Sequence, residues 1–196
     1  RNAAAVIELF NPGMCGGQAL ADAVFGRFNP SGKLTISFPV HVGQQPVYYS
    51  QVRGQHGDRY ADLTQEPVFA FGEGLSYTTY EYSNLKAETP EINKSGKAAF
   101  SVKIKNTGKR AGVEVAQLYI RDLVTSATWV DKELKAYARV ELQPGEEKTV
   151  RFELSSSALS IVNAAGERVV ESGEFEALAG PDSRNKSLLA VRFRVV

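Results

Sequence analysis

Residues 66–80 read Glu-Pro-Val-Phe-Ala-Phe-Gly-Glu-Gly-Leu-Ser-Tyr-Thr-Thr-Tyr and separate two parts of the chain that carry different patterns. The stretch begins like the dinucleotide fingerprint Gly-x-Gly-x-x-Gly, but Tyr77 stands where the last glycine is required. Ser76 also lacks the Gly-x-Ser-x-Gly context of a hydrolase nucleophile. We therefore interpret 66–80 as a packing motif, in which glycines allow a tight backbone path and aromatic rings fill pockets.

Upstream of this motif, the sequence indicates one small α/β unit. The apolar run at 3–10 shows little alternation, which is typical of a strand buried on both faces of a parallel sheet. A glycine-rich turn follows, and apolar spacing predicts a helix over 18–25. The turn Asn29-Pro30-Ser31-Gly32 then leads into an alternating, half-exposed strand over 33–38. Such a unit cannot cover its own strand, so we expect residues 1–40 to complete a larger sheet.

Beyond the motif, the pattern changes to short alternating strands. From about Tyr82 onward, apolar residues recur at every second position between turns such as Gln143-Pro144-Gly145-Glu146, which predicts an antiparallel β-sandwich. The apolar phase slips between Val115 and Ala116, and we expect a β-bulge there. Residues 41–81 have no lasting periodicity but are rich in aromatic side chains, which favours an ordered, docked connector.

Composition excludes several classes of function. The chain has 196 residues and a net charge of +1, which argues against nucleic acid or an anionic membrane as the main partner. Its single cysteine, Cys15, rules out an internal disulfide and a cysteine-based zinc site. The two histidines, His41 and His56, have no neighbouring ligand pattern, so we predict no metal and no cofactor.

The order of these motifs resembles the C-terminal third of glycoside hydrolase family 3, the β-glucosidase and β-xylosidase type. The resemblance is strongest at 29–34 and 71–79, and a weaker match covers 119–122 with 132–135. It implies that 1–40 end an (α/β)6-type sandwich domain, that 41–81 form the connector, and that 82–196 form an all-β fibronectin type III-like sandwich of immunoglobulin type. The chain departs from the family pattern at Ala70, Glu73 and Tyr80, and it has Ala136-Tyr137 where the family has Gly-Phe.

By this resemblance, the whole enzyme is an exo-acting, retaining β-glycosidase, most directly a β-glucosidase. The family's catalytic Asp and Glu lie in its barrel and earlier in its sandwich domain, so we assign no catalytic residue to this chain and expect it to be a C-terminal portion. The alternatives are a β-xylosidase of the same family, a purely structural spacer, and a non-catalytic binding module centred on Trp129. We favour a packing role for Trp129, and we expect Asp122 and Lys132 to tie a loop.

The connector holds the candidate substrate-binding residues. Its Tyr-, Arg- and Gly-rich stretch 48–60 offers the flat apolar faces and forked donors that a sugar site requires. Arg53 and Arg59 are the first candidates, and His56 and Tyr60 the second; the alternative is a surface linker whose arginines form ion pairs.

The partners implied are a β-linked oligosaccharide and the N-terminal barrel and sandwich portion of the same enzyme, with no nucleic acid and no membrane; a homodimer is left open. We expect a periplasmic or secreted location, with any targeting signal outside these residues. Asn93 and Asn185 stand in glycosylation patterns that arise often by chance.

Overall fold

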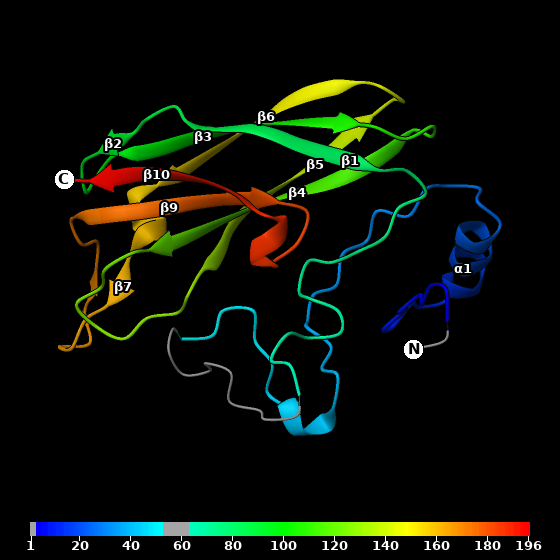
Figure 1. Ribbon diagram of the computed structural model, residues 1–196, viewed down its shortest axis with the longest axis horizontal. Helices are drawn as coiled ribbons and strands as arrows, with labels where there is room; N and C mark the ends of the chain where they lie inside the picture. Colours follow the sequence, from blue (N-terminus) through cyan, green and yellow to red (C-terminus); the bar gives the residue numbers. More distant parts are fainter. Residues whose placement is uncertain (1–2, 53–62) are drawn as a thin grey trace.

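The computed structural model describes residues 3–52 and 63–196 and contains a two-layered β-sandwich (Figure 1). One layer has the strand order β1-β3-β6, and the other has the order β2-β10-β9-β4-β5. The bounds are β1 Tyr80–Ala87, β2 Glu91–Ile92, β3 Lys97–Asn106, β4 Gly112–Asp122, β5 Glu133–Leu142, β6 Glu147–Ser155, β9 Gly173–Gly180 and β10 Leu189–Val195. A small hairpin pairs β7 Ile161–Val162 with β8 Arg168–Val169.

The described helices are short. They are α1 Gly16–Val24 and the 3₁₀ turns η1 Val42–Gln44, η2 Ser156–Leu159 and η3 Asn185–Ser187. Among residues 3–52 and 63–196, no helix is long and apolar enough to cross a lipid bilayer.

The sandwich core confirms the alternation predicted from the sequence. Phe100, Val102 and Ile104 of β3 are fully buried between the layers. The Phe100 and Phe193 rings meet edge to face with centroids 5.0 Å apart, which is a favourable arrangement for aromatic pairs. All described pairings in the two layers are antiparallel except that of β2 with β10.

Strand β4 is buried on both faces, and this explains the slip in its apolar phase. Ala116, Leu118 and Ile120 face the core, whereas Gln117 and Tyr119 are buried on the outer face. The pairing with β5 runs without interruption through Val115 and Ala116; its register shifts at Leu118/Tyr119 instead. The predicted position of the bulge was therefore wrong, because the sequence signal came from a second buried face.

The connector covers that outer face. The Gln117 side-chain amide donates to the carbonyl oxygens of Gly72, at 3.0 Å, and Pro181, at 2.6 Å. The Tyr49 ring stacks on Phe71 at 4.3 Å and meets Tyr119 edge to face at 5.8 Å. The prediction of a docked connector is thus confirmed for its described part.

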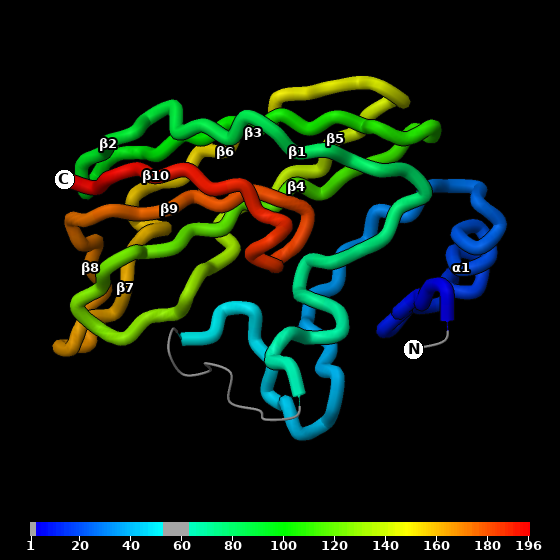
Figure 2. The backbone as a smooth tube through the Cα atoms, in the orientation of Figure 1, coloured from blue at the N-terminus to red at the C-terminus, as the bar shows by residue number. Residues whose placement is uncertain are grey.

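The segment that precedes the connector also lies beside the C-terminal part of the connector (Figure 2). Leu34 and Gly72 are joined by a backbone hydrogen bond of 2.7 Å, and Phe38 forms an isolated bridge with Phe69. The strand expected over 33–38 is reduced to this single bridge, because between its two ends the Phe71 amide bonds the Ser37 hydroxyl, at 3.2 Å, and not a backbone carbonyl.

Polar contacts fasten residues 29–33 to the sandwich. The Asn29 side chain accepts hydrogen bonds from Ser76 and from the backbone of Tyr77, and it donates to the carbonyl of Ala111. Lys33 forms a 3.2 Å ion pair with buried Glu114. These contacts place the N-terminal residues at one end of the sandwich.

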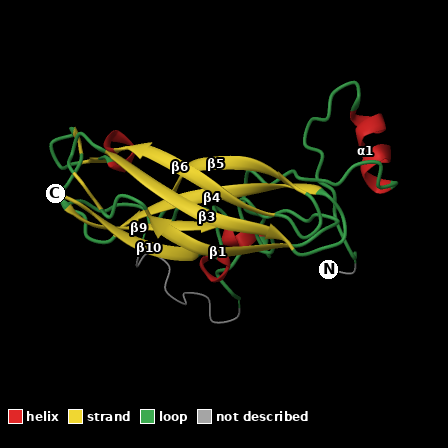
Figure 3. Cartoon of the chain, turned by 90° about the horizontal axis from the view of Figure 1, so that it is seen from above, coloured by secondary structure: helices red, strands yellow, loops and turns green. Residues whose placement is uncertain are grey.

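The N-terminal α/β unit is only partly present as predicted. Helix α1 confirms the helix expected over 18–25, and it stands away from the sandwich (Figure 3). Residues 3–10 form no strand, however, and Val6 is 67% and Phe10 53% exposed. A parallel strand needs neighbours for its hydrogen bonds and covers for both faces, and the described residues supply neither.

We predict that Gly72→Ala destabilises the chain more than Gly145→Ala. Both glycines have left-handed backbones, with φ of 77° and 78°, so alanine costs each about 1 kcal/mol in strain. At Gly72 the new methyl group also collides with the Gln117 amide, whereas nothing lies near it at Gly145. In urea unfolding, Gly72→Ala should lower the free energy of unfolding by about 1–2 kcal/mol more than Gly145→Ala does. Equal losses would contradict close docking at Gly72.

Candidate functional site

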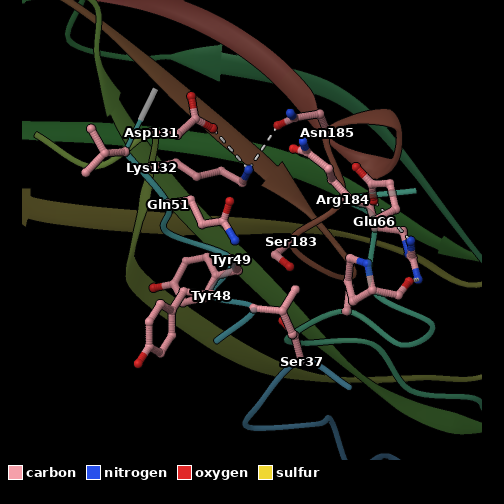
Figure 4. Close-up of a pocket in the computed structure, with 15 residues that line it drawn as sticks. Ser37, Tyr48, Tyr49, Gln51, Glu66, Asp131, Lys132, Ser183, Arg184 and Asn185 are labelled. Carbon is pink, nitrogen blue, oxygen red and sulfur yellow. Dashed lines mark hydrogen bonds and ion pairs between the residues drawn. The ribbon is translucent and has the colours of Figure 1, made fainter. Parts of the chain in front are cut away.

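A cavity of about 320 Å³ lies where the connector meets the sandwich (Figure 4). Its walls come from the connector around Tyr48–Val52 and 65–70, from the loop that enters β5, and from the turn between β9 and β10. The sequence brings these segments together because the outer face of β4 receives the connector beside both loops.

A cluster of charges closes one side of the cavity. Lys132 is only 5% exposed, and its ammonium donates to Asp131 at 3.2 Å and to the Asn185 side-chain oxygen at 3.0 Å. Burial lowers the pKa of Lys132, and the neighbouring carboxylate of Asp131 offsets part of this effect. Arg121 also donates to Asp131 and Asn185, at 2.9 and 3.0 Å, so one carboxylate and one amide oxygen hold two cations.

Arg121 carries a further carboxylate partner. Its guanidinium donates to Glu176 at 2.8 Å. Burial opposes the charge of Arg121, but Asp131 and Glu176 outweigh it and raise the pKa of the guanidinium. The cluster is therefore a fixed set of charges that supports the cavity wall.

Arg184 closes the other side of the cavity and fastens the connector. Its guanidinium donates to Glu73, at 3.0 Å, to Glu66, at 3.3 Å, and to the carbonyl oxygens of Pro67 and Val68. Glu73, which replaces an aromatic residue of the family pattern, thus has a partner of opposite charge. The same carboxylate accepts from the backbone of Ala70 at 2.8 Å, which closes the turn of the motif.

The residues proposed to bind substrate, Arg53, His56, Arg59 and Tyr60, lie outside the described residues. Both described flanks of that segment are attached to the sandwich. Val52 forms a bridge with Val130, and the Asp131 amide donates to the carbonyl of Gln51 at 2.8 Å. On the other side, Glu66 is held by Arg184. The rim of the sandwich therefore fixes both attachment points of the candidate stretch.

Asp122 and Lys132 fasten the loop between β4 and β5 at its two ends. Asp122 accepts from the backbone of Val124 at 3.2 Å, whereas Lys132 reaches across to Asn185. Trp129 in the same loop is half-buried, and its indole N–H donates to Glu133 at 3.1 Å. Its ring lines a small hollow with Ile120 and Phe175, in agreement with the packing role favoured for it.

Sequence reasoning missed Arg184 and Ser183, and it noted Asn185 only as part of a glycosylation pattern. The departure at Glu73 was the one available signal, because an acidic residue in an aromatic position calls for a cation nearby. Within the described parts of the chain, no three His, Cys, Asp or Glu side chains converge as a metal site requires.

We predict that Arg184→Ala releases residues 64–74 locally. The substitution leaves Glu73 and two carbonyl oxygens without their shared donor, and Arg184 is mostly buried. Hydrogen exchange over 64–74 should accelerate about tenfold or more, because that segment opens more easily. Peptides from β3 should keep their protection.

Arg192→Ala is the matched control. Arg192 is 70% exposed and reaches its carboxylate partner only at 3.8 Å, so exchange over 64–74 should not change. Unaltered exchange in Arg184→Ala would show that the Gln117 hydrogen bond and the aromatic contacts hold the connector without Arg184.

Comparison with known families gives two matches along the chain. Residues 1–77 match the glycosyl hydrolase family 3 C-terminal domain, and residues 114–183 match the fibronectin type III-like domain. The first match extends through most of the connector and includes the 66–77 part of the motif.

Individual relatives agree. A periplasmic β-glucosidase of Salmonella typhimurium is 40% identical over 93% of this chain and 25% of its own length. A β-xylosidase of Formosa agariphila is 41% identical over 99% of this chain and 27% of its own. The solved structure of a β-glucosidase involved in saponin metabolism from intestinal bacteria superposes with a TM-score of 0.91 at 52% identity, over 95% of this chain and 25% of that one. The chain thus spans about a quarter of the length of these relatives.

Proposed function

Because the chain belongs to glycoside hydrolase family 3, whose two C-terminal domains it carries, we propose that it is the C-terminal portion of an exo-acting, retaining β-glycosidase. A β-glucosidase that releases glucose from β-linked oligosaccharides is the first choice of activity, supported by the names of the Salmonella and intestinal relatives. A β-xylosidase is the second, supported by the Formosa relative.

The observation that carries this proposal is the unequal burial of the chain. The sandwich has a closed core and a docked connector, whereas residues 3–10 and the C-terminal end of α1 expose apolar side chains, among them Val6, Phe10 and Val24. Exposed apolar side chains gathered in one segment mark a surface that another body covers. In the proposed enzyme, this body is the remainder of the (α/β)6-type sandwich domain.

In this proposal the chain has three parts. Residues 1–40 complete the (α/β)6-type sandwich domain, residues 41–81 form the connector that braces the domains, and residues 82–196 form the fibronectin type III-like domain. The partners are then the N-terminal barrel and sandwich portion, together with a β-linked oligosaccharide. A periplasmic or secreted location is proposed, with support from the periplasmic Salmonella relative. Neither a metal nor a cofactor is needed for retaining glycoside hydrolysis by two carboxylates.

The activity is tested with an aryl β-glucoside and an aryl β-xyloside. We expect residues 1–196 to be inert alone, since no catalytic carboxylate is assigned to them, and the intact protein that carries them to hydrolyse one substrate. The faster substrate identifies the sugar. Hydrolysis by residues 1–196 alone would overturn the placement of the catalytic groups, and an inert intact protein would favour a binding module.

Arg53 and Arg59 are proposed to bind the sugar of the substrate, with His56 and Tyr60 beside them. The attachment of Val52 to Val130, and of Glu66 to Arg184, supports this role because it fixes both ends of the stretch. In the intact enzyme, Arg53→Ala and Arg59→Ala should each lower kcat/KM about tenfold or more, as expected for a lost charged hydrogen bond. Arg192→Ala should leave kcat/KM unchanged. Unaltered kcat/KM in both test variants would favour the surface-linker alternative.

A further inference from the structure

We propose that the cavity between the connector and the sandwich is a binding site for one neutral pyranose ring. Its volume of about 320 Å³ lies at the small end of ligand pockets, which span roughly 300–1,000 Å³. The choice of a pyranose over another small polyol rests on the proposed function. The existence of the site rests on the side chains that face the cavity.

The first such side chain is Ser183. The residue is only 6% exposed, its backbone N–H donates to the Phe71 carbonyl, and its hydroxyl points into the cavity (Figure 4). This hydroxyl has no hydrogen-bond partner among residues 3–52 and 63–196. The hydroxyl faces the open cavity, so a ligand hydroxyl can both donate to it and accept from it.

Gln51 and Lys132 supply complementary groups. The side-chain carboxamide of Gln51 borders the cavity, and no described residue forms a hydrogen bond with it. The backbone carbonyl of Gln51, by contrast, accepts from the Asp131 amide. The ammonium of Lys132 has three N–H groups and donates two of them, to Asp131 and to Asn185. The third N–H can donate to a ligand in the cavity. One hydroxyl, one carboxamide and one ammonium N–H converge, which matches the mixed donors and acceptors of adjacent sugar hydroxyls.

The remaining walls suit a sugar rather than an anion. Tyr48 stands at the mouth, 65% exposed, and offers an aromatic face of the kind that small-molecule pockets use for apolar contact. The positive charges of Lys132 and Arg184 are already occupied by carboxylates, Asp131 for the first and Glu66 and Glu73 for the second, so no unpaired cation is left to attract an anion. A neutral ligand therefore binds without leaving an unmatched charge.

The test is equilibrium dialysis of residues 1–196 with radiolabelled methyl β-D-glucoside. We expect one sugar per chain, with glycerol a poor competitor because it lacks the ring. Gln51→Leu, which keeps the volume but removes the amide, and Ser183→Ala should each weaken binding about tenfold. Gln143→Ala, at an exposed turn outside the cavity lining, is the control and should bind as the unaltered chain does.

The outcomes separate this site from the proposed activity, because the chain is tested without the catalytic carboxylates. No binding at millimolar sugar, or equal binding by all three variants, would overturn the proposal even if the intact protein hydrolyses its substrate. Loss of binding in Trp129→Ala, but not in Gln51→Leu, would also overturn it and move the site to the sandwich loop. Thermal unfolding of each variant confirms that it is folded.

Discussion

The structure depends on the hydrogen bonds by which one buried amide, that of Gln117, holds the connector to the sandwich. Gln117 lies in the middle of β4 and donates to Gly72 and Pro181, while Tyr119 donates to its oxygen at 2.5 Å. A strand in a free-standing sandwich would face water on this side. Here the side chain must be satisfied by backbone that arrives from far along the chain, since an unpaired buried amide would be costly. Removing the connector would leave this face both apolar and unsatisfied.

Around that amide, the docking uses aromatic rings on one side and charges on the other. Tyr49 and Phe71 supply a stacked pair against Tyr119, and burial raises the pKa of the Tyr119 phenol. Arg184 and Glu73 supply an ion pair that is partly shielded from water. This ion pair adds little net stability, because the cost of removing its charges from water offsets their attraction. Its fixed geometry, however, selects one position for the connector. The rings bind the connector, and the ion pair sets its register.

Those contacts explain which parts of the fold the sequence could predict. The strands β3, β6 and β10 follow from alternation because one face of each is buried and the other is more exposed, whereas β9 is buried on both faces from Ala177 onward. The slip in β4 was interpreted as a bulge, since alternation alone cannot distinguish an extra residue from a second covered face. The strand over 3–10 was expected from its apolar content, but its partners lie outside these residues. The cavity could not be predicted, because Gln51, Lys132 and Ser183 are far apart in sequence; the 48–60 stretch that contains Gln51 was noted as a candidate, but nothing in the sequence connects it to Lys132 and Ser183.

The first forty residues show how a segment without its own core is held in place. Asn29 joins Ser76, Tyr77 and Ala111 through its side chain alone, and Lys33 shares the buried carboxylate of Glu114 with the Tyr82 hydroxyl, which donates at 2.8 Å. Burial and that carboxylate raise the pKa of Tyr82, so the phenol stays protonated as a donor. These polar links need no apolar area from the N-terminal segment. The apolar side chains of the N-terminal segment therefore stay exposed. The sandwich can hold this segment in place by polar contacts while its apolar surface is available to pack against a second domain.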